Sequence, residues 1–221
     1  MSNIKTIAIV GAAGKIGSAI ARSLRGKYTL LLMSSDKSKV AELARELSSP
    51  VSEVFALTCA KDAAWEADII IIATPYAEDG KVAEKIKDVA VGKIVISVSN
   101  PLDDSNNNLG VSRDSSAAEE LQKLLPHSKV VKTFNTAFAA DFMTTVKDGR
   151  MVDAFIAGNN SDAVDAVAKM IASAGFTPVV VGDLTMSRTL ERMQLTLRKM
   201  AMRDNIPPYS GSMFQASRSG S

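Results

Sequence analysis

The chain has 221 residues, of which 46% are hydrophobic and 23% are charged, so it is long enough to bury one substantial core. Its formal net charge is only +2, and no stripe of basic residues with interleaved aromatics is present, which excludes nucleic acid as an expected partner. A single cysteine, Cys59, excludes an intrachain disulfide, and with His127 as the only histidine we expect no metal site.

The first residues run directly into a strand-like stretch, without the charged and then apolar regions of a signal peptide. The longest apolar runs in the chain are far shorter than a membrane span. We therefore expect a cytoplasmic protein without a membrane partner.

Short β-rich runs alternate with segments of helical periodicity along the chain. Strands are predicted at 7–10, 30–33, 69–73, 94–98, 130–132, 154–157 and 177–181, and helices at 16–24, 40–47, 82–89, 117–125 and 162–174. The run from Ile69 to Ile72 is apolar at every position, which is typical of parallel strands covered by helices on both faces. The pattern predicts an α/β protein with a Rossmann-type, doubly wound and mostly parallel sheet.

The last predicted helix runs from Leu184 to Met202 and forms a C-terminal helical appendage. Met186, Met193 and Met200 lie seven residues apart, so they form one stripe that either packs on the sheet or pairs with a second subunit. Packing on the sheet is the simpler interpretation of the stripe. We nevertheless expect a homodimer, because the crevice at the carboxyl ends of the strands would otherwise be open on that side. The predicted division is a Rossmann-type domain at 1–181 and a C-terminal helix and tail at 182–221.

A glycine loop joins the first predicted strand to the first helix. Its sequence is Gly11-Ala12-Ala13-Gly14-Lys15-Ile16-Gly17. We expect Gly11 to allow the sharp turn, Gly14 to let the backbone approach a pyrophosphate, and Gly17 to permit close packing of helix on strand. The phosphates would face the N-terminus of the helix, whose free N–H groups attract anions. The alternative is a structural turn that binds nothing.

The end of the second strand carries the expected preference for NADP. A site for NAD usually has Asp or Glu there, which accepts hydrogen bonds from both ribose hydroxyls. Here Ser34 and Ser35 occupy that region, and with Lys37 and Lys39 they could hold a 2′-phosphate. Alternatively, Ser35 and Asp36 cap the next helix, and an inward-facing Asp36 would shift the preference to NAD.

Two further strand ends are expected to line the same crevice. The segment Thr74-Pro75-Tyr76 follows one strand and would face the adenosine ribose, whereas Ser99-Asn100-Pro101 follows the next strand and would approach the nicotinamide. The polar loop Asp103 to Asn108 comes directly after and is interpreted as a flexible flap. Either proline could also act only as a strand terminator.

Taken together, these segments resemble the family of NADP oxidoreductases that depend on the deazaflavin coenzyme F420, whose nucleotide domain is shared with pyrroline-carboxylate reductases and metalloreductases. The segment Lys132-Thr133-Phe134-Asn135-Thr136 is similar to the family's K-x-F-N-T stretch. The resemblance implies that this stretch lies beside the nicotinamide and the incoming acceptor, with Asn135, Thr136, Ala137 and Phe138 shaping the acceptor side. The glycine loop departs from the family's usual spacing by one extra residue.

The expected activity is hydride transfer between NADP(H) and a small-molecule acceptor, with F420 or a flavin as the second substrate. Two stacked rings suffice for this chemistry, so no catalytic acid or base is assigned. One alternative is a non-enzymatic sensor that only binds NADP(H). Another is a reductase of a small imine or carbonyl, which would need a proton donor such as Tyr76, Lys132 or Asp141 near the nicotinamide.

Overall fold

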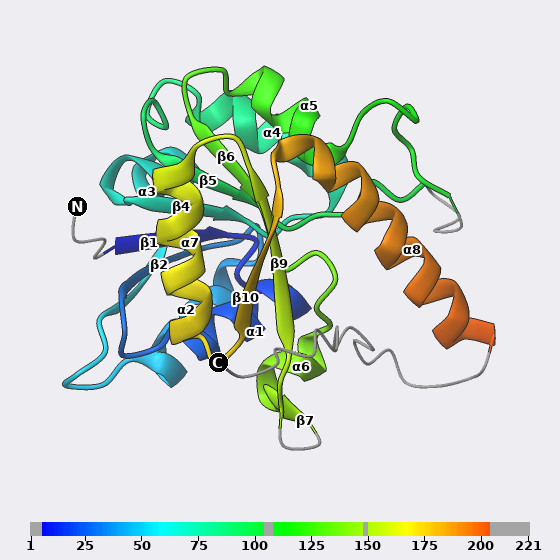
Figure 1. Ribbon diagram of the computed structural model, residues 1–221. Helices are drawn as coiled ribbons and strands as arrows, with labels where there is room; N and C mark the ends of the chain where they lie inside the picture. Colours follow the sequence, from blue (N-terminus) through cyan, green and yellow to red (C-terminus); the bar gives the residue numbers. More distant parts are fainter. Residues whose placement is uncertain (1–5, 104–107, 148–149, 204–221) are drawn as a thin grey trace.

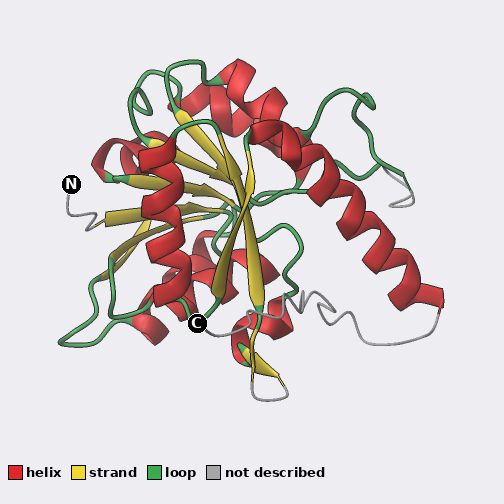
Figure 2. Ribbon diagram, in the orientation of Figure 1, coloured by secondary structure: helices red, strands yellow, loops and turns green. Residues whose placement is uncertain are grey.

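The computed structural model describes residues 6–103, 108–147 and 150–203. It contains one eight-stranded sheet with the order β10-β9-β6-β5-β4-β1-β2-β3, flanked by helices on both faces (Figures 1 and 2). The strands of this sheet are β1 (Thr6–Val10), β2 (Thr29–Met33), β3 (Val54–Leu57), β4 (Ile69–Ile72), β5 (Ile94–Ser97), β6 (Lys129–Lys132), β9 (Asp153–Gly158) and β10 (Thr177–Gly182). All neighbouring strands are parallel except β6 and β9. The predicted doubly wound, mostly parallel sheet is confirmed.

The helices are α1 (Lys15–Leu24), α2 (Lys37–Leu47), α3 (Ala60–Glu66), α4 (Tyr76–Ile86), α5 (Ala117–Leu124), α6 (Ala139–Met143), α7 (Ser161–Ser173) and α8 (Ser187–Arg203). A short 3-10 turn, η1 (Leu184–Met186), precedes α8, and a small hairpin is formed by β7 (Val146–Lys147) and β8 (Arg150–Met151). Helix α8 begins beside α5 and extends away from the sheet (Figure 1).

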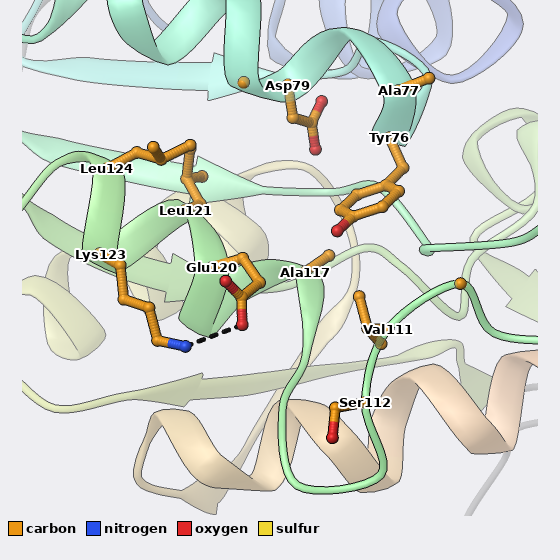
Figure 3. A pocket seen from close by; sticks show the side chains of 12 residues that line it. Tyr76, Ala77, Asp79, Val111, Ser112, Ala117, Glu120, Leu121, Lys123 and Leu124 are labelled. Carbon is orange, nitrogen blue, oxygen red and sulfur yellow. Dashed lines mark hydrogen bonds and ion pairs between the residues drawn. The ribbon is translucent and has the colours of Figure 1, made fainter.

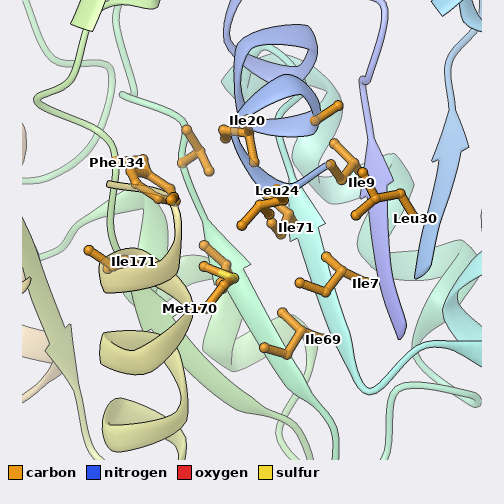
Figure 4. Close-up of a cluster of buried hydrophobic side chains, with 14 of the residues drawn as sticks. Ile7, Ile9, Ile20, Leu24, Leu30, Ile69, Ile71, Phe134, Met170 and Ile171 are labelled. Carbon is orange, nitrogen blue, oxygen red and sulfur yellow. The ribbon is translucent and has the colours of Figure 1, made fainter. Parts of the chain in front are cut away.

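Two hydrophobic clusters cover the two faces of the sheet because alternate strand residues point to opposite sides. One face carries Ile7, Ile9 and Ile71 against α1, α2 and α7 (Figure 4). The other carries Val10 and Ile72 against α3, α4 and α5. A third, smaller cluster joins β9 and β10 to α8 and includes Met186 and Met193, so these two methionines pack on the sheet.

The sequence prediction differs from the structure in several elements. It missed β3, α3, α6 and the β7–β8 hairpin, which are all short, and β3 is an edge strand with an exposed Phe55. Helix α4 begins at Tyr76 and not at Val82, because Pro75 occupies its N-cap position and Glu78 lies in its first turn. Residues 104–107 of the predicted flap and the tail after residue 203 lie outside the described residues.

Candidate functional site: a cleft at the carboxyl ends of the strands

The glycine loop turns sharply between β1 and α1. Gly11 has a φ of +90°, and a Cβ there would lie 2.6 Å from the carbonyl oxygen of Ala73. A Cβ on Gly17 would lie 2.3 Å from the carbonyl oxygen of Gly11, so this glycine allows α1 to pack against the loop. Both expected roles are confirmed.

Gly14 differs from the other two glycines because the space around it is more open. A Cβ there would meet only Gly11 O at 3.2 Å and Ala73 O at 4.0 Å. Gly14 is also the N-cap of α1 and provides no side chain to the first helical turn. The amides of this turn are thus available to a ligand, as a pyrophosphate site requires.

The glycine loop lies against the end of β2. The amides of Gly11 and Ala12 both donate to the carbonyl oxygen of Met33, at 2.8 and 3.0 Å. Ser34 follows directly and is half-buried, whereas Ser35 and Lys37 are exposed. The fold therefore places the predicted ribose-binding segment next to the predicted pyrophosphate loop.

Asp36 caps α2 with its side chain. Its Oδ1 accepts hydrogen bonds from the Lys39 amide at 3.0 Å and the Ser38 hydroxyl at 2.8 Å, while its Oδ2 lies 3.2 Å from Lys39 Nζ. These contacts, led by the hydrogen bond from the Lys39 amide, lower the pKa of Asp36 to about 2. The predicted cap is confirmed for Asp36. Both oxygens of its carboxylate have partners in the first turn of α2.

A cleft of about 510 Å³ runs from the start of α1 to the middle of α8. Seven of the predicted site residues line it, namely Lys15, Ile16, Thr74, Ser99, Asn100, Asn135 and Ala137. Phe138, predicted on the acceptor side, is also in the wall. Of the residues that line this cleft, only Lys15 and Arg198 carry ionisable side chains.

The other predicted residues lie around this cleft or away from it. Gly11, Ala12, Ala13 and Gly14 form the turn beside its α1 end, Pro101 and Thr136 are buried, and Pro75 starts α4. Tyr76 faces a second cavity between α4 and α5, where its ring lies near Ala117 and Glu120 (Figure 3). The structure thus separates Tyr76 from the cleft that its neighbour Thr74 lines.

The turn after β6 is strained and well supported. Phe134 has a φ of +59°, a backbone angle that residues other than glycine rarely adopt. Its ring is buried against Phe142 and Phe176, with centroid distances of 5.2 and 5.6 Å. Such strain persists only where the surroundings hold it, and it is concentrated at functional sites.

This turn presents Asn135 to the loop after β5. Asn100 Nδ2 donates to the backbone carbonyl of Asn135 at 2.9 Å, and Asn135 Nδ2 donates to Asn100 Oδ1 at 3.0 Å. The fourth polar side-chain atom of these two asparagines, Asn135 Oδ1, is buried and has no hydrogen-bond partner among the described residues. It is therefore a free hydrogen-bond acceptor in the wall of the cleft.

A fully buried ion pair anchors α8 to the sheet. Lys132 Nζ lies 2.7 Å from Glu191 Oε1 and donates to the carbonyl oxygen of Ser99 at 2.5 Å, and neither charged side chain has solvent exposure. Glu191 Oε2 accepts a hydrogen bond from the amide of Ala117 at 3.0 Å. The pair thus joins β6, the loop after β5, the start of α5 and α8.

Asp79 connects the two loops that were predicted to line the crevice. Thr74 Oγ1 donates to Asp79 Oδ1 at 2.8 Å, and Ser99 Oγ donates to Asp79 Oδ2 at 2.5 Å. Burial raises the pKa of Asp79 to about 6, although both hydroxyl hydrogen bonds oppose this shift.

This raised pKa predicts a pH dependence of stability. Between about pH 4 and pH 6, Asp79 is protonated in the folded state and ionised in the unfolded state, so the free energy of unfolding falls as the pH rises. The stability gained at low pH is lost through this window, in total about 3 kcal/mol. Asp79→Asn should remove this slope in urea titrations at pH 4 and pH 7. An unchanged pH slope in the variant would assign it to other groups.

Sequence reasoning missed four of the polar residues that build the site. Asp79 and Glu191 are buried charges, and Gln194 and Arg198 line the cleft from α8. One sequence signal was present, because Glu191, Gln194 and Arg198 follow a spacing of three and four residues and so form a polar line along α8.

No helix among the described residues is long and apolar enough to cross a membrane, and no group of three or more potential metal ligands was found in that part of the chain. The exposed His127 lies before β6, away from the cleft lining.

Comparison with known proteins shows a similarity to one family of oxidoreductases. The sequence profile of the family described as "NADP oxidoreductase coenzyme F420-dependent" matches residues 6–101. The F420-dependent NADP reductase of Methanocaldococcus jannaschii is 29% identical over 84% of this chain and 87% of its own length.

Two crystal structures extend the similarity to most of the fold. A hypothetical protein from Sinorhizobium meliloti, SMa0349, is 31% identical, with a TM-score of 0.72 over 85% of this chain and 89% of that one. A structure from Arthrobacter sp. FB24 has a TM-score of 0.80 over 92% of this chain and 96% of that one, and its 24% identity shows the shared fold alone. Together with the profile and the archaeal relative, these similarities show that the chain resembles the F420-dependent NADP oxidoreductases, with the profile match confined to residues 6–101.

Proposed function

We propose that this protein transfers hydride between NADP(H) and a deazaflavin such as F420, or a flavin-like acceptor, with the two rings stacked in the 510 Å³ cleft. One observation carries the proposal: among the described residues, the only ionisable side chains that line the cleft are Lys15 and Arg198, so this lining offers no carboxylic acid, histidine or tyrosine to protonate a substrate. Hydride transfer between two rings needs only their alignment and the exclusion of water, so such a lining suits it.

The nucleotide would extend along the carboxyl ends of the strands. Its pyrophosphate would rest on the first turn of α1 at Gly14, Lys15 and Ile16, where open amides and the Lys15 ammonium attract anions. The carboxamide of the nicotinamide would reach Asn135, whose buried Oδ1 is free to accept a hydrogen bond.

The contacts of Asp36 support NADP over NAD. An inward-facing acid would repel a 2′-phosphate, but this carboxylate pairs with Lys39 and caps α2. Ser34, Ser35 and Lys37 remain to bind the phosphate through hydroxyl and ammonium groups.

The bound rings supply the redox chemistry: one hydride leaves NADPH and one proton comes from solvent, which gives NADP⁺ and the two-electron-reduced acceptor. The chain itself positions the rings. The strained Phe134 turn and the Asn100–Asn135 hydrogen bonds fix one wall, and α8, held by Glu191, fixes the other.

The location of the possible proton donors argues against an imine or carbonyl reductase. Lys132 is buried in its ion pair with Glu191, and Asp141 is buried and accepts a hydrogen bond from the Phe138 amide. Tyr76 lines the other cavity (Figure 3). None of the three belongs to the lining of the cleft in the described structure.

The test is to add NADPH and NADH separately to the protein with F420, FMN or menadione, and to follow nicotinamide and acceptor absorbance together. We expect NADPH to be oxidised in step with F420 reduction, and NADH to react far more slowly. Tight NADPH binding without turnover of any acceptor would favour a sensor over an enzyme. Absence of NADPH binding would refute the site itself.

A homodimer in the cytoplasm remains part of the proposal. Met186 and Met193 pack on the sheet, but Met200 and Met202 are 48% and 63% exposed near the end of α8. This exposed apolar end is suited to a second copy of the chain. Elution at monomer mass at micromolar concentration would argue against it.

A further inference from the structure

Helix α8 contributes two polar side chains to the cleft lining. Gln194 Oε1 and Arg198 Nε are buried without a hydrogen-bond partner among the described residues, and both side chains line the cavity. Gln194 as a whole is only 9% exposed. Buried polar atoms normally have hydrogen-bond partners. A free acceptor and a free charged donor in residues that line one cavity therefore indicate a ligand that supplies the missing partners.

The two side chains lie one helical turn apart and so point to the same side of α8. Glu191, on the preceding turn, is locked into the buried ion pair with Lys132. Rotation of α8 would break this pair, so the helix holds Gln194 and Arg198 in a fixed direction relative to the cleft.

The same cleft is also lined by Lys15 and Ile16 from α1 and by Asn135, which is hydrogen-bonded to Asn100 in the loop after β5. If the nicotinamide half uses Asn135, the polar pair on α8 is left for the second ring. This step rests on the proposed function.

The ligand chemistry follows from the two free atoms. Oε1 needs an N–H donor, and the guanidinium needs a carbonyl oxygen close to it. A flavin or deazaflavin ring presents both on its pyrimidine edge, where an N3–H group stands between two carbonyl groups. A quinone has carbonyl oxygens but no N–H.

We propose that Gln194 and Arg198 determine acceptor specificity by binding the imide edge of the ring, with Oε1 accepting from N3–H and the guanidinium donating to an adjacent carbonyl oxygen. The pair thus selects deazaflavins and flavins over acceptors that lack the N–H group.

The test uses 5-deazariboflavin and its N3-methyl derivative as probes, with binding followed by quenching of deazaflavin fluorescence in the presence of NADP⁺. The full chain should bind the parent compound about tenfold more tightly, because methylation removes the donor. In Gln194→Ala this preference should disappear. The two affinities separate the hydrogen bond from a steric effect. Loss of the hydrogen bond weakens binding of the parent compound to the level of the N3-methyl compound, whereas relief of a clash would instead strengthen binding of the N3-methyl compound, and that result would overturn the assignment.

Arg198→Met should weaken binding of both probes by about tenfold while keeping the preference between them. The matched controls are Thr196→Ala and Lys199→Met, which alter exposed neighbours on the same helix. Both should bind the two probes as the unmodified chain does.

Retention of the full N3–H preference in Gln194→Ala would overturn the assignment, as would an equal loss in the Thr196 control. These outcomes are distinguishable from failure of the proposed function. Probe binding is measured without turnover, and NADPH affinity of each variant is measured separately.

Discussion

Glu191→Leu should lower the free energy of unfolding by about 3–5 kcal/mol, because it leaves the Lys132 ammonium buried without its counter-charge. The remaining contact of this ammonium, to the carbonyl oxygen of Ser99, does not neutralise the charge. The change also removes the acceptor for the Ala117 amide at the start of α5. Urea unfolding at neutral pH measures the effect.

Two controls separate the buried charge from a simple change of packing. The double variant Lys132→Met/Glu191→Leu should recover most of the lost stability, since both charges are then absent. Glu46→Gln breaks a pair with Arg22 whose side chains are about half exposed, and it should change stability by less than about 1 kcal/mol. Equal losses in the single and double variants would contradict the explanation.

Gly14→Val should weaken NADPH binding on the order of 100-fold, because its side chain would occupy the position through which the pyrophosphate reaches the first turn of α1. The backbone of Gly14 is extended, with φ −72° and ψ 165°, so valine fits it. The substituted Cβ would approach only Gly11 O closely, at 3.2 Å. Fluorescence titration with NADPH measures binding, and circular dichroism checks the fold.

Two other glycines serve as comparisons for this variant. Gly80→Ala lies in α4, where the new Cβ meets only Leu124 Cδ1 at 4.0 Å, so NADPH binding should not change. Gly17→Ala should instead destabilise the fold, since its Cβ would lie 2.3 Å from a backbone oxygen. If Gly14→Val folds and keeps its NADPH affinity, the loop does not hold the pyrophosphate.

The sequence by itself determined the sheet and the turn at the glycine loop because those signals are local. Apolar runs such as Ile69 to Ile72 must be covered by helices on both faces of the sheet. The glycine pattern can be interpreted because a strand directly precedes it and a helix directly follows it. Short elements such as β3 and α6 carry too few residues for a periodic pattern, and they were missed.

The second half of the site was decided by tertiary structure alone. Asp79 meets Ser99 and Lys132 meets Glu191 across 20 and 59 residues of sequence, and no local pattern reports such pairs. The same packing turns Gln194 and Arg198 into the cleft and directs Tyr76 into another cavity. Neighbouring residues in the sequence specify a backbone turn. The partner of a buried charge depends instead on which distant elements pack against that charge in the folded protein.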